Sequence, residues 1–137
     1  MILRLSTVYG DSPRKRFDLV ANRFILMAIK KIKISLFGAS SWRPFISTND
    51  VSRILIKVLK VDNKKVRNQI FNVGGDKENY RILDIVNTIK KYIPINFELT
   101  KKVEDTRNYK VSFNKIKKIL QFTPKDNLKK MIYVLIK

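Results

Sequence analysis

One arginine in this sequence stands in a setting suited to binding an anion. Arg43 follows the only tryptophan, Trp42, and precedes Pro44, which restricts the backbone around it. A guanidinium held on a stiff segment beside aromatic rings matches a planar or phosphorylated anion, because its N–H groups pair with two oxyanion oxygens at once. The residues alone leave a second interpretation open, in which Arg43 is an ordinary surface charge beside a core tryptophan.

Two residue types that often perform catalysis are missing. The chain has 137 residues and contains no histidine and no cysteine. Without histidine it lacks the usual general base at neutral pH and the commonest metal ligand. Without cysteine it has no disulfide framework and no thiolate metal site. We therefore expect no metal site within this chain and no histidine or cysteine chemistry.

The charge balance is strongly basic, with 30 lysine and arginine residues against 11 acidic residues and a formal net charge of +19. Such an excess can indicate a nucleic-acid or anionic-membrane partner. The lysines, however, occur in pairs along the whole chain, at positions typical of helix C-terminal turns and solvent faces. Because the charge is dispersed in the sequence, a dedicated nucleic-acid site is not favoured.

The elements that must position these residues alternate between strands and helices, which predicts an α/β fold. The expected strands are residues 2–8, 34–37, 44–47, 69–75, 79–81 and 96–100. The expected helices are residues 17–30, 50–60, 82–92, 112–120 and a last one from about residue 127, with a charged loop at 61–68. The first strand is apolar on both faces, which favours a parallel sheet covered on both sides.

Three of the helices have distinctive patterns. The one at 17–30 is apolar nearly all round, so we expect it to be buried against more than one neighbour. The one at 50–60 has apolar residues at the i, i+3, i+4, i+7 spacing, with Thr48 or Asn49 as its N-cap. Ser112 is the expected N-cap of the helix at 112–120.

The sequence predicts one compact unit, residues 1–137, without repeats or flexible linkers. No apolar run is long enough to cross a membrane, so no membrane partner is expected. The N-terminal stretch is interrupted by Arg4 and does not have the order of a signal peptide. A cytoplasmic location is the expectation for such a chain.

Four segments carry a resemblance to a known family. They are LRLSTVYG, FGASSWRPFISTNDV, FNVGGDKENYRILDIV and DTRNYKVSFNKIKKILQFTP, and together they span nearly the whole chain. In this order and spacing they resemble the C-terminal half of the NAD-dependent nucleotide-sugar epimerase/dehydratase family. These enzymes are extended short-chain dehydrogenases, with UDP-glucose 4-epimerase as the best-known type. The resemblance implies a substrate-binding lobe plus two strands of the parallel Rossmann sheet, with the N-terminal cofactor-binding part missing.

The resemblance also implies a set of substrate-binding residues for a nucleoside-diphosphate sugar. Arg43 and Arg107 match two family arginines that clasp the diphosphate, which suits two charge-assisted guanidinium forks. Ser35 and Phe37 match positions that contact the nucleobase, although core packing is an equally open role for Phe37. Asp18 stands where the family often has an amide-bearing residue that contacts the substrate, and a carboxylate there would repel phosphate.

The family's cofactor and proton-transfer motifs are absent from this sequence. A dinucleotide site needs a Gly-rich turn between a strand and a helix, and no such motif occurs. The family's Tyr-x-x-x-Lys pair, in which lysine lowers the tyrosine pKa, is matched in spacing only by Tyr133 and Lys137 at the chain terminus, where accident is the better explanation. We therefore expect no cofactor in this chain alone, although the full-length family uses NAD, and no activity from the chain alone.

Two further expectations follow from the missing half. The strands 2–8 and 69–75 would lose their sheet neighbours, and exposed strand edges invite pairing with another chain. We therefore expect either self-association or a separate N-terminal Rossmann polypeptide as partner. The alternative function is a non-enzymatic basic module that binds nucleic acid or another polyanion. The residues also leave open a chain with no selected role.

Overall fold

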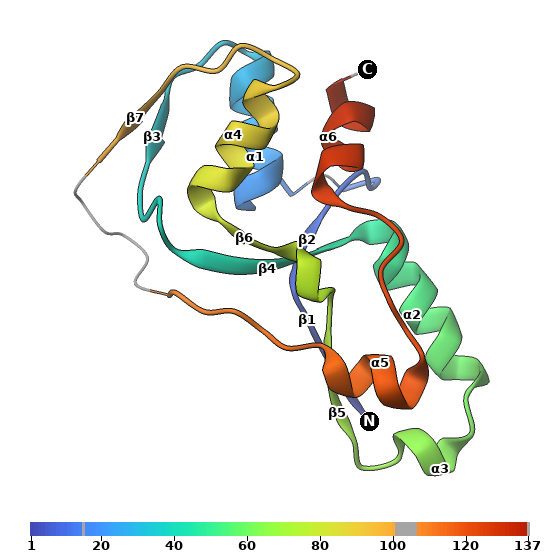
Figure 1. Ribbon diagram of the computed structural model, residues 1–137. Coiled ribbons are helices and arrows are strands. Elements are labelled where there is room, and N and C mark those ends of the chain that lie inside the picture. Colours follow the sequence, from blue (N-terminus) through green and yellow to red (C-terminus); the bar gives the residue numbers. More distant parts are fainter. Residues whose placement is uncertain (15, 101–106, 137) are drawn as a thin grey trace.

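The computed structural model describes residues 1–14, 16–100 and 107–136, and it confirms the α/β class. Two hydrophobic cores organise the chain into an upper and a lower lobe, as oriented in Figure 1. The strands are β1 (Ile2–Leu5), β2 (Thr7–Tyr9), β3 (Ile34–Leu36), β4 (Trp42–Ser47), β5 (Ile70–Val73), β6 (Asn79–Arg81) and β7 (Phe97–Leu99). The α-helices are α1 (Val20–Ile29), α2 (Thr48–Lys60), α3 (Asn63–Val66), α4 (Ile82–Lys90), α5 (Asn114–Leu120) and α6 (Leu128–Ile136), and η1 (Asp76–Glu78) is a 3-10 turn.

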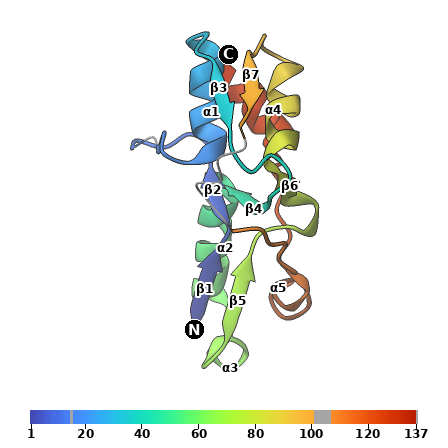
Figure 2. The ribbon, with the colours of Figure 1, turned by 90° about the vertical axis from the view of Figure 1, so that its left-hand side faces the viewer.

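The lower lobe contains a parallel two-stranded ribbon, in which β1 pairs with β5. Phe71 and Val73 of β5 are fully buried in the lower core, whereas Ile2 and Leu5 of β1 are 55% and 45% exposed. Figure 2 looks onto the outer face of this ribbon, with α2 behind it and β1 at its free edge. The predicted burial of the first strand on both faces is therefore wrong within the described part of the chain.

A one-residue break at Ser6 divides the predicted strand 2–8 into two strands. Ser6 donates both its N–H, at 3.0 Å, and its hydroxyl, at 2.8 Å, to the carbonyl oxygen of Val73. The chain then leaves β5, and β2 pairs in parallel with β4, which pairs antiparallel with β6 on its other side. This three-stranded sheet lies between the two lobes (Figure 1).

The upper lobe is built from a second parallel ribbon, β3–β7, and from three helices. α1 contacts both α4 and α6, as expected for a helix that is apolar nearly all round. It begins at Val20 rather than at residue 17, because Leu19 has an extended backbone with φ −83° and ψ 136°. The side chain of Asp18 is instead paired with Arg16, so these residues belong to the preceding turn.

The amphipathic helix predicted at 50–60 is α2, but its N-cap is Ser47. The Ser47 hydroxyl oxygen accepts the Asp50 N–H at 3.0 Å, which places the cap one residue before the predicted Thr48 or Asn49. The helix buries Ile54 fully, and Val51 and Val58 pack against the same core. Pattern reasoning therefore located the helix and its buried face but not its first residue.

Two predictions in the lower lobe need correction. The stretch 61–68, expected to be a loop, contains the single turn α3, whose first turn is capped by Asp62 through a 2.9 Å bond from the Lys64 N–H. The helix expected at 112–120 begins at Asn114, with Phe113 in the N-cap position instead of Ser112. Phe113 is buried in the lower core, and the Ser112 hydroxyl oxygen accepts the N–H of Asn114 at 3.4 Å from one position further out. Among the described residues, no helix is long and apolar enough to cross a bilayer.

Candidate functional site

A cavity of about 440 Å³ opens in the upper lobe, between α1, β3, β4 and the segment that begins at Arg107. All five residues that the sequence assigns to a substrate site line it, namely Asp18, Ser35, Phe37, Arg43 and Arg107. Its other charged lining residues, Arg23 and Lys33, are both cationic. The cavity is therefore surrounded mainly by positive charge, which suits an anionic ligand.

Arg43 is the most buried of these charged groups, with 8% of its surface exposed. Its Nη1 donates a hydrogen bond to the carbonyl oxygen of Trp42 at 2.8 Å and another to that of Arg107. Its guanidinium carbon also lies 5.7 Å from the ring centroid of Tyr109. The guanidinium is thus held in one place at the wall of the cavity, rather than being an ordinary surface charge.

The segment from Arg107 to Lys110 is held against β4 through contacts with Trp42, the residue before Arg43. The Trp42 N–H donates to the Asn108 side-chain oxygen at 2.9 Å, and the Tyr109 N–H donates to the Trp42 carbonyl oxygen at 3.3 Å. Lys110 Nζ lies 3.6 Å from the centroid of the Trp42 ring. These contacts bring Arg107 to the same cavity as Arg43, although the two residues are 64 positions apart.

Ser35 and Phe37 lie on the other wall of the cavity, at β3. Ser35 is exposed and donates its hydroxyl to Glu98 of β7 at 3.2 Å, and Lys33 forms a 2.5 Å ion pair with the same carboxylate. Hydrogen bonds from Lys33 and Ser35 lower the pKa of Glu98. Phe37 is half-buried and lines the cavity, whereas Phe45 of β4 is fully buried in the core.

Asp18 is exposed at the rim of the cavity, where Arg16 neutralises it. The Arg16 guanidinium donates to both carboxylate oxygens, at 2.7 and 2.5 Å, and holds the pKa of Asp18 at about 2. The carboxylate therefore stays ionised, but its charge is balanced within the turn that precedes α1. This pairing reduces the repulsion of phosphate that the sequence predicts for this position.

A second cavity, of about 370 Å³, adjoins the first and was not predicted from the sequence. Thr7, Leu19 and Tyr109 line both cavities, so the two adjoin, and we refer to them together as the cleft. Gly10, with φ +118°, lines the second cavity and donates its N–H to the Asn22 side-chain oxygen at 3.3 Å. Asn22 also donates to the Arg16 carbonyl oxygen at 3.2 Å, so both ends of its side-chain amide are hydrogen-bonded within the fold.

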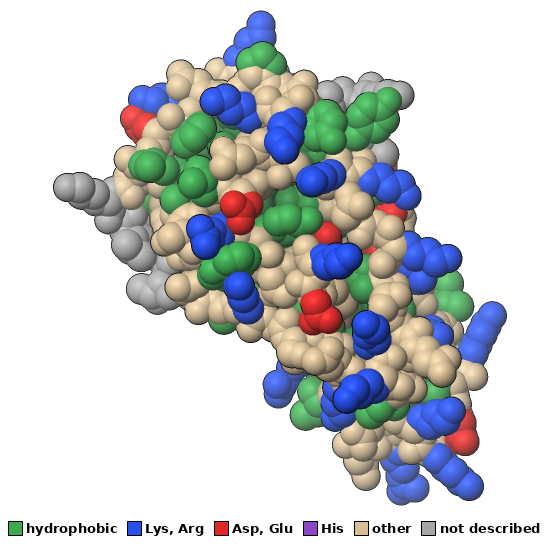
Figure 3. Space-filling view, viewed as in Figure 1, with side chains coloured by type: hydrophobic (Ala, Val, Ile, Leu, Met, Phe, Trp, Pro, Cys, Tyr) green, Lys and Arg blue, Asp and Glu red, His purple; other side chains and the backbone are tan. Residues whose placement is uncertain are grey.

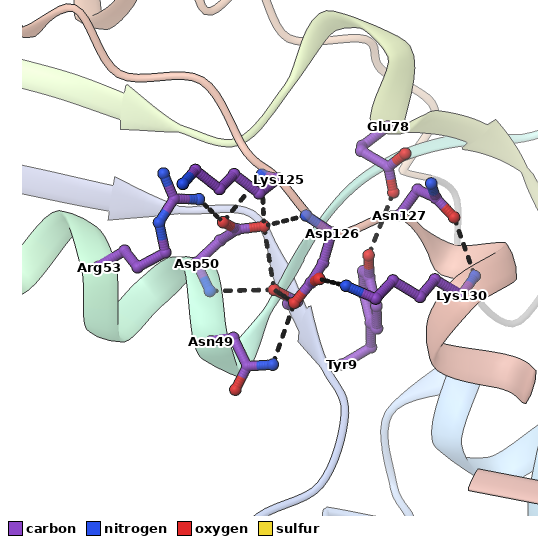
Figure 4. A network of polar contacts seen from close by, with 10 residues as sticks. Tyr9, Asn49, Asp50, Arg53, Glu78, Lys125, Asp126, Asn127 and Lys130 are labelled. Atoms are coloured by element: carbon purple, nitrogen blue, oxygen red, sulfur yellow. Dashed lines mark hydrogen bonds and ion pairs between the residues drawn. The ribbon is translucent and has the colours of Figure 1, made fainter. Parts of the chain in front are cut away.

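The most buried acidic groups lie outside this cleft, in a polar network between the two lobes (Figure 4). The carboxylate of Asp50 is fully buried and accepts the backbone N–H groups of Lys125 and Asp126, both at 3.0 Å, and a bond from Arg53. Asp126 accepts Lys130 at 2.9 Å, and this bond lowers its pKa. The network ties α2 to the segment that leads into α6, and no sequence motif pointed to it.

Glu78 is the second buried carboxylate of this region. It accepts the hydroxyl groups of Tyr9 at 3.3 Å and Tyr80 at 3.0 Å, and the N–H of Leu128, the first residue of α6, at 3.2 Å. Burial raises the pKa of Glu78, and these hydrogen bonds oppose part of that rise. The hydrogen bonds place Glu78 as a link between β2, β6 and α6.

Two features of the described residues bear on the two kinds of site that the sequence does not predict, a metal site and a dinucleotide site. No group of three or more acidic side chains there could hold a metal ion. Gly74 and Gly75 end β5, but the 3-10 turn η1 follows them instead of a helix whose N-terminus could receive a pyrophosphate. Gly74 is required for packing, because a Cβ there would lie 2.5 Å from Ser6 Oγ.

Comparisons with known proteins agree with this architecture. Residues 1–74 match the model of the NAD dependent epimerase/dehydratase family. UDP-glucuronic acid 4-epimerase from Bacillus cereus, solved with UDP-glucuronic acid and NAD, is 28% identical with a TM-score of 0.80. The fold is also shared by MoeE5, solved with UDP-glucuronic acid and NAD, at 21% identity and a TM-score of 0.79. A third similar structure is UDP-N-acetylglucosamine 4-epimerase from Bacillus cereus, at 20% identity and a TM-score of 0.74.

These alignments cover nearly all of this chain but less than half of each relative. The covered share is 96%, 96% and 97% of this chain, and 42%, 44% and 45% of the three relatives in the same order. The family model covers more than half of the chain and agrees with the fold of these structures. The chain therefore belongs to the NAD dependent epimerase/dehydratase family and spans part of its fold.

Proposed function

We propose that this chain is the nucleotide-sugar-binding C-terminal portion of an NAD-dependent nucleoside-diphosphate-sugar epimerase or dehydratase. The observation that carries the proposal is the single cavity that brings together Arg43, Arg107, Ser35 and Phe37. In this cavity the two arginines bind the diphosphate and Phe37 offers an apolar face to the nucleobase. The adjoining cavity leaves room for the sugar.

The hydride and proton chemistry would come from a part of the enzyme that this chain does not contain. The described residues do not form a dinucleotide site, and the relatives that bind NAD are more than twice as long as the part matched here. The bare outer face and free edge of the β1–β5 ribbon support a cofactor-binding α/β half as partner, because parallel sheets are normally covered on both faces. The chain alone is then expected to bind substrate without converting it.

Isothermal titration calorimetry with UDP-glucose, dTDP-glucose and GDP-mannose tests this proposal. We expect at least one of them to bind the wild-type chain, and Arg43→Ala to weaken that binding at least about ten-fold, because a charge-assisted bidentate contact is lost. Arg67→Ala is the matched control, since Arg67 is exposed in the lower lobe outside the cavity. Absence of binding by the wild-type chain, or equal binding by Arg43→Ala, would overturn the proposal. Epimerisation by the purified chain with added NAD would contradict the expected inactivity.

One observation favours polyanion binding as a second candidate function. Lysine and arginine side chains cover the visible face of both lobes, and on the lower lobe few acidic side chains lie among them (Figure 3). The segments 51–69 and 112–121 contribute Arg53, Lys57, Lys60, Lys64, Lys65, Arg67, Lys115, Lys117 and Lys118, and their one acidic residue is Asp62. This function requires nucleic-acid binding that weakens steeply with salt. Binding to a DNA duplex that is weak or independent of salt in a fluorescence-anisotropy titration would exclude it.

A further inference from the structure

Three polar side chains meet on the upper ribbon, where β3 lines the cavity. Ser35 of β3 and Glu98 of β7 are direct cross-strand partners. Ser35 Oγ lies 3.2 Å from Glu98 Oε1, and Lys33 Nζ lies 2.5 Å from Glu98 Oε2. Ser35 and Lys33 line the cavity. The carboxylate thus lies beside the position proposed for the nucleobase.

This arrangement fixes which way the Ser35 hydroxyl can point. A hydroxyl has one hydrogen to donate and two lone pairs that accept. Glu98 is kept ionised by Lys33, and an ionised carboxylate can only accept hydrogen bonds. The single hydroxyl hydrogen of Ser35 is therefore committed to Glu98. Only the lone pairs of Ser35 remain for a molecule in the cavity.

We infer that Glu98, acting through Ser35, makes this site select a nucleobase that carries a ring N–H. Uracil, thymine and guanine present such a donor, whereas cytosine and adenine present a ring nitrogen with a lone pair at the corresponding edge. A lone pair facing the oxygen lone pairs of Ser35 makes no hydrogen bond and loses its hydration. The inference rests on the proposed function and specifies the nucleotide class that the site takes. Glu98 is a positioning residue here, since it acts through Ser35.

Paired titrations with UDP-glucose and CDP-glucose test this inference, because the two ligands differ only in the base. The wild-type chain is expected to bind UDP-glucose about ten-fold more tightly than CDP-glucose. This difference corresponds to one hydrogen bond gained with uracil and to the desolvation penalty of an unpaired nitrogen in cytosine. Glu98→Ala frees the Ser35 hydroxyl hydrogen, so this variant is expected to bind CDP-glucose several-fold more tightly than wild type does. Its preference for UDP-glucose over CDP-glucose should then fall to about two-fold. Ser35→Ala is expected to reduce the preference by weakening UDP-glucose binding, without strengthening CDP-glucose binding.

The gain in CDP-glucose affinity separates this role from a structural one, because damage to the fold would weaken both ligands. Asp62→Asn, an exposed carboxylate in the lower lobe, is the matched control and should leave the preference unchanged. Equal binding of both ligands by wild type, or an unchanged preference in Glu98→Ala, would overturn the inference. Neither result would affect the proposal that Arg43 and Arg107 bind the diphosphate. Loss of all binding in wild type would instead overturn the proposed function.

Discussion

The upper cleft and the network around Asp50 both concentrate charge, but they use it differently. Asp50 is fully buried, and its oxygens are occupied by the backbone of residues 125–126 and by Arg53. In the cleft, Arg107 and Ser35 are exposed and line an open hollow. A charge whose hydrogen bonds are all made within the fold stabilises it, whereas a charge at an open cavity can bind a ligand. The difference supports a stabilising role for the first region and agrees with the recognition role proposed for the second.

The largest effect is expected from breaking the network at its centre. Asp50→Ala leaves the N–H groups of Lys125 and Asp126 and the guanidinium of Arg53 without their common acceptor, so we expect a loss of about 3–5 kcal/mol in the free energy of unfolding. Urea denaturation followed by circular dichroism measures it. Asp62→Ala, which removes an exposed helix cap, should cost only about 1 kcal/mol. Equal losses for the two variants would contradict the assignment of stability to the network.

A second prediction concerns the pH dependence that Glu78 gives to the same region. Because burial raises its pKa in the folded state, the protonated form favours folding. The stability contributed by this group is full below the unfolded-state pKa of about 4.3 and declines as pH rises through the folded-state pKa. Denaturation curves between pH 4 and pH 8 should therefore show wild type losing stability relative to Glu78→Gln as pH rises. The opposite slope would mean that the hydrogen bonds to Tyr9, Tyr80 and Leu128 outweigh desolvation.

The smallest effect on stability is expected at the bare ribbon. Ile2→Lys and Leu5→Lys replace exposed apolar side chains, so each should change the free energy of unfolding by no more than about 0.5 kcal/mol. Their effect should appear in association instead, because a lysine on an edge strand opposes pairing with another chain. Light scattering at high concentration should find the wild-type chain self-associated and the double variant less so. A wild-type chain that stays monomeric would contradict the expectation that the exposed edge of the β1–β5 ribbon pairs with another chain.

Sequence reasoning located most elements because their apolar patterns are regular. The helix around Ile54 and the ribbon strand around Phe71 were found in this way, and both residues are fully buried. It missed the Ser47 cap by one residue and the one-turn helix α3, because such features depend on a single local hydrogen bond. The division of the first strand at Ser6 depends on the Val73 carbonyl, which no local pattern contains.

The cleft residues could be predicted only from the family resemblance and not from the residues alone. No property of the residues alone could bring Arg43 and Arg107 together, and the family resemblance supplied that expectation. Asp50 and Glu78 were missed because each is defined by partners far away in the sequence, such as Leu128 for Glu78. Long-range polar contacts of this type have no periodic signal in the sequence.

The most direct test of the account is a double-mutant cycle on the two arginines of the cleft. Dissociation constants for the nucleoside-diphosphate sugar that binds best would be measured for wild type, Arg43→Ala, Arg107→Ala and the double variant. If both guanidiniums bind one diphosphate, each single variant should weaken binding and the double variant should bind several-fold more tightly than the product of the single losses predicts. Strictly multiplicative losses, or no loss in either single variant, would contradict a shared phosphate site.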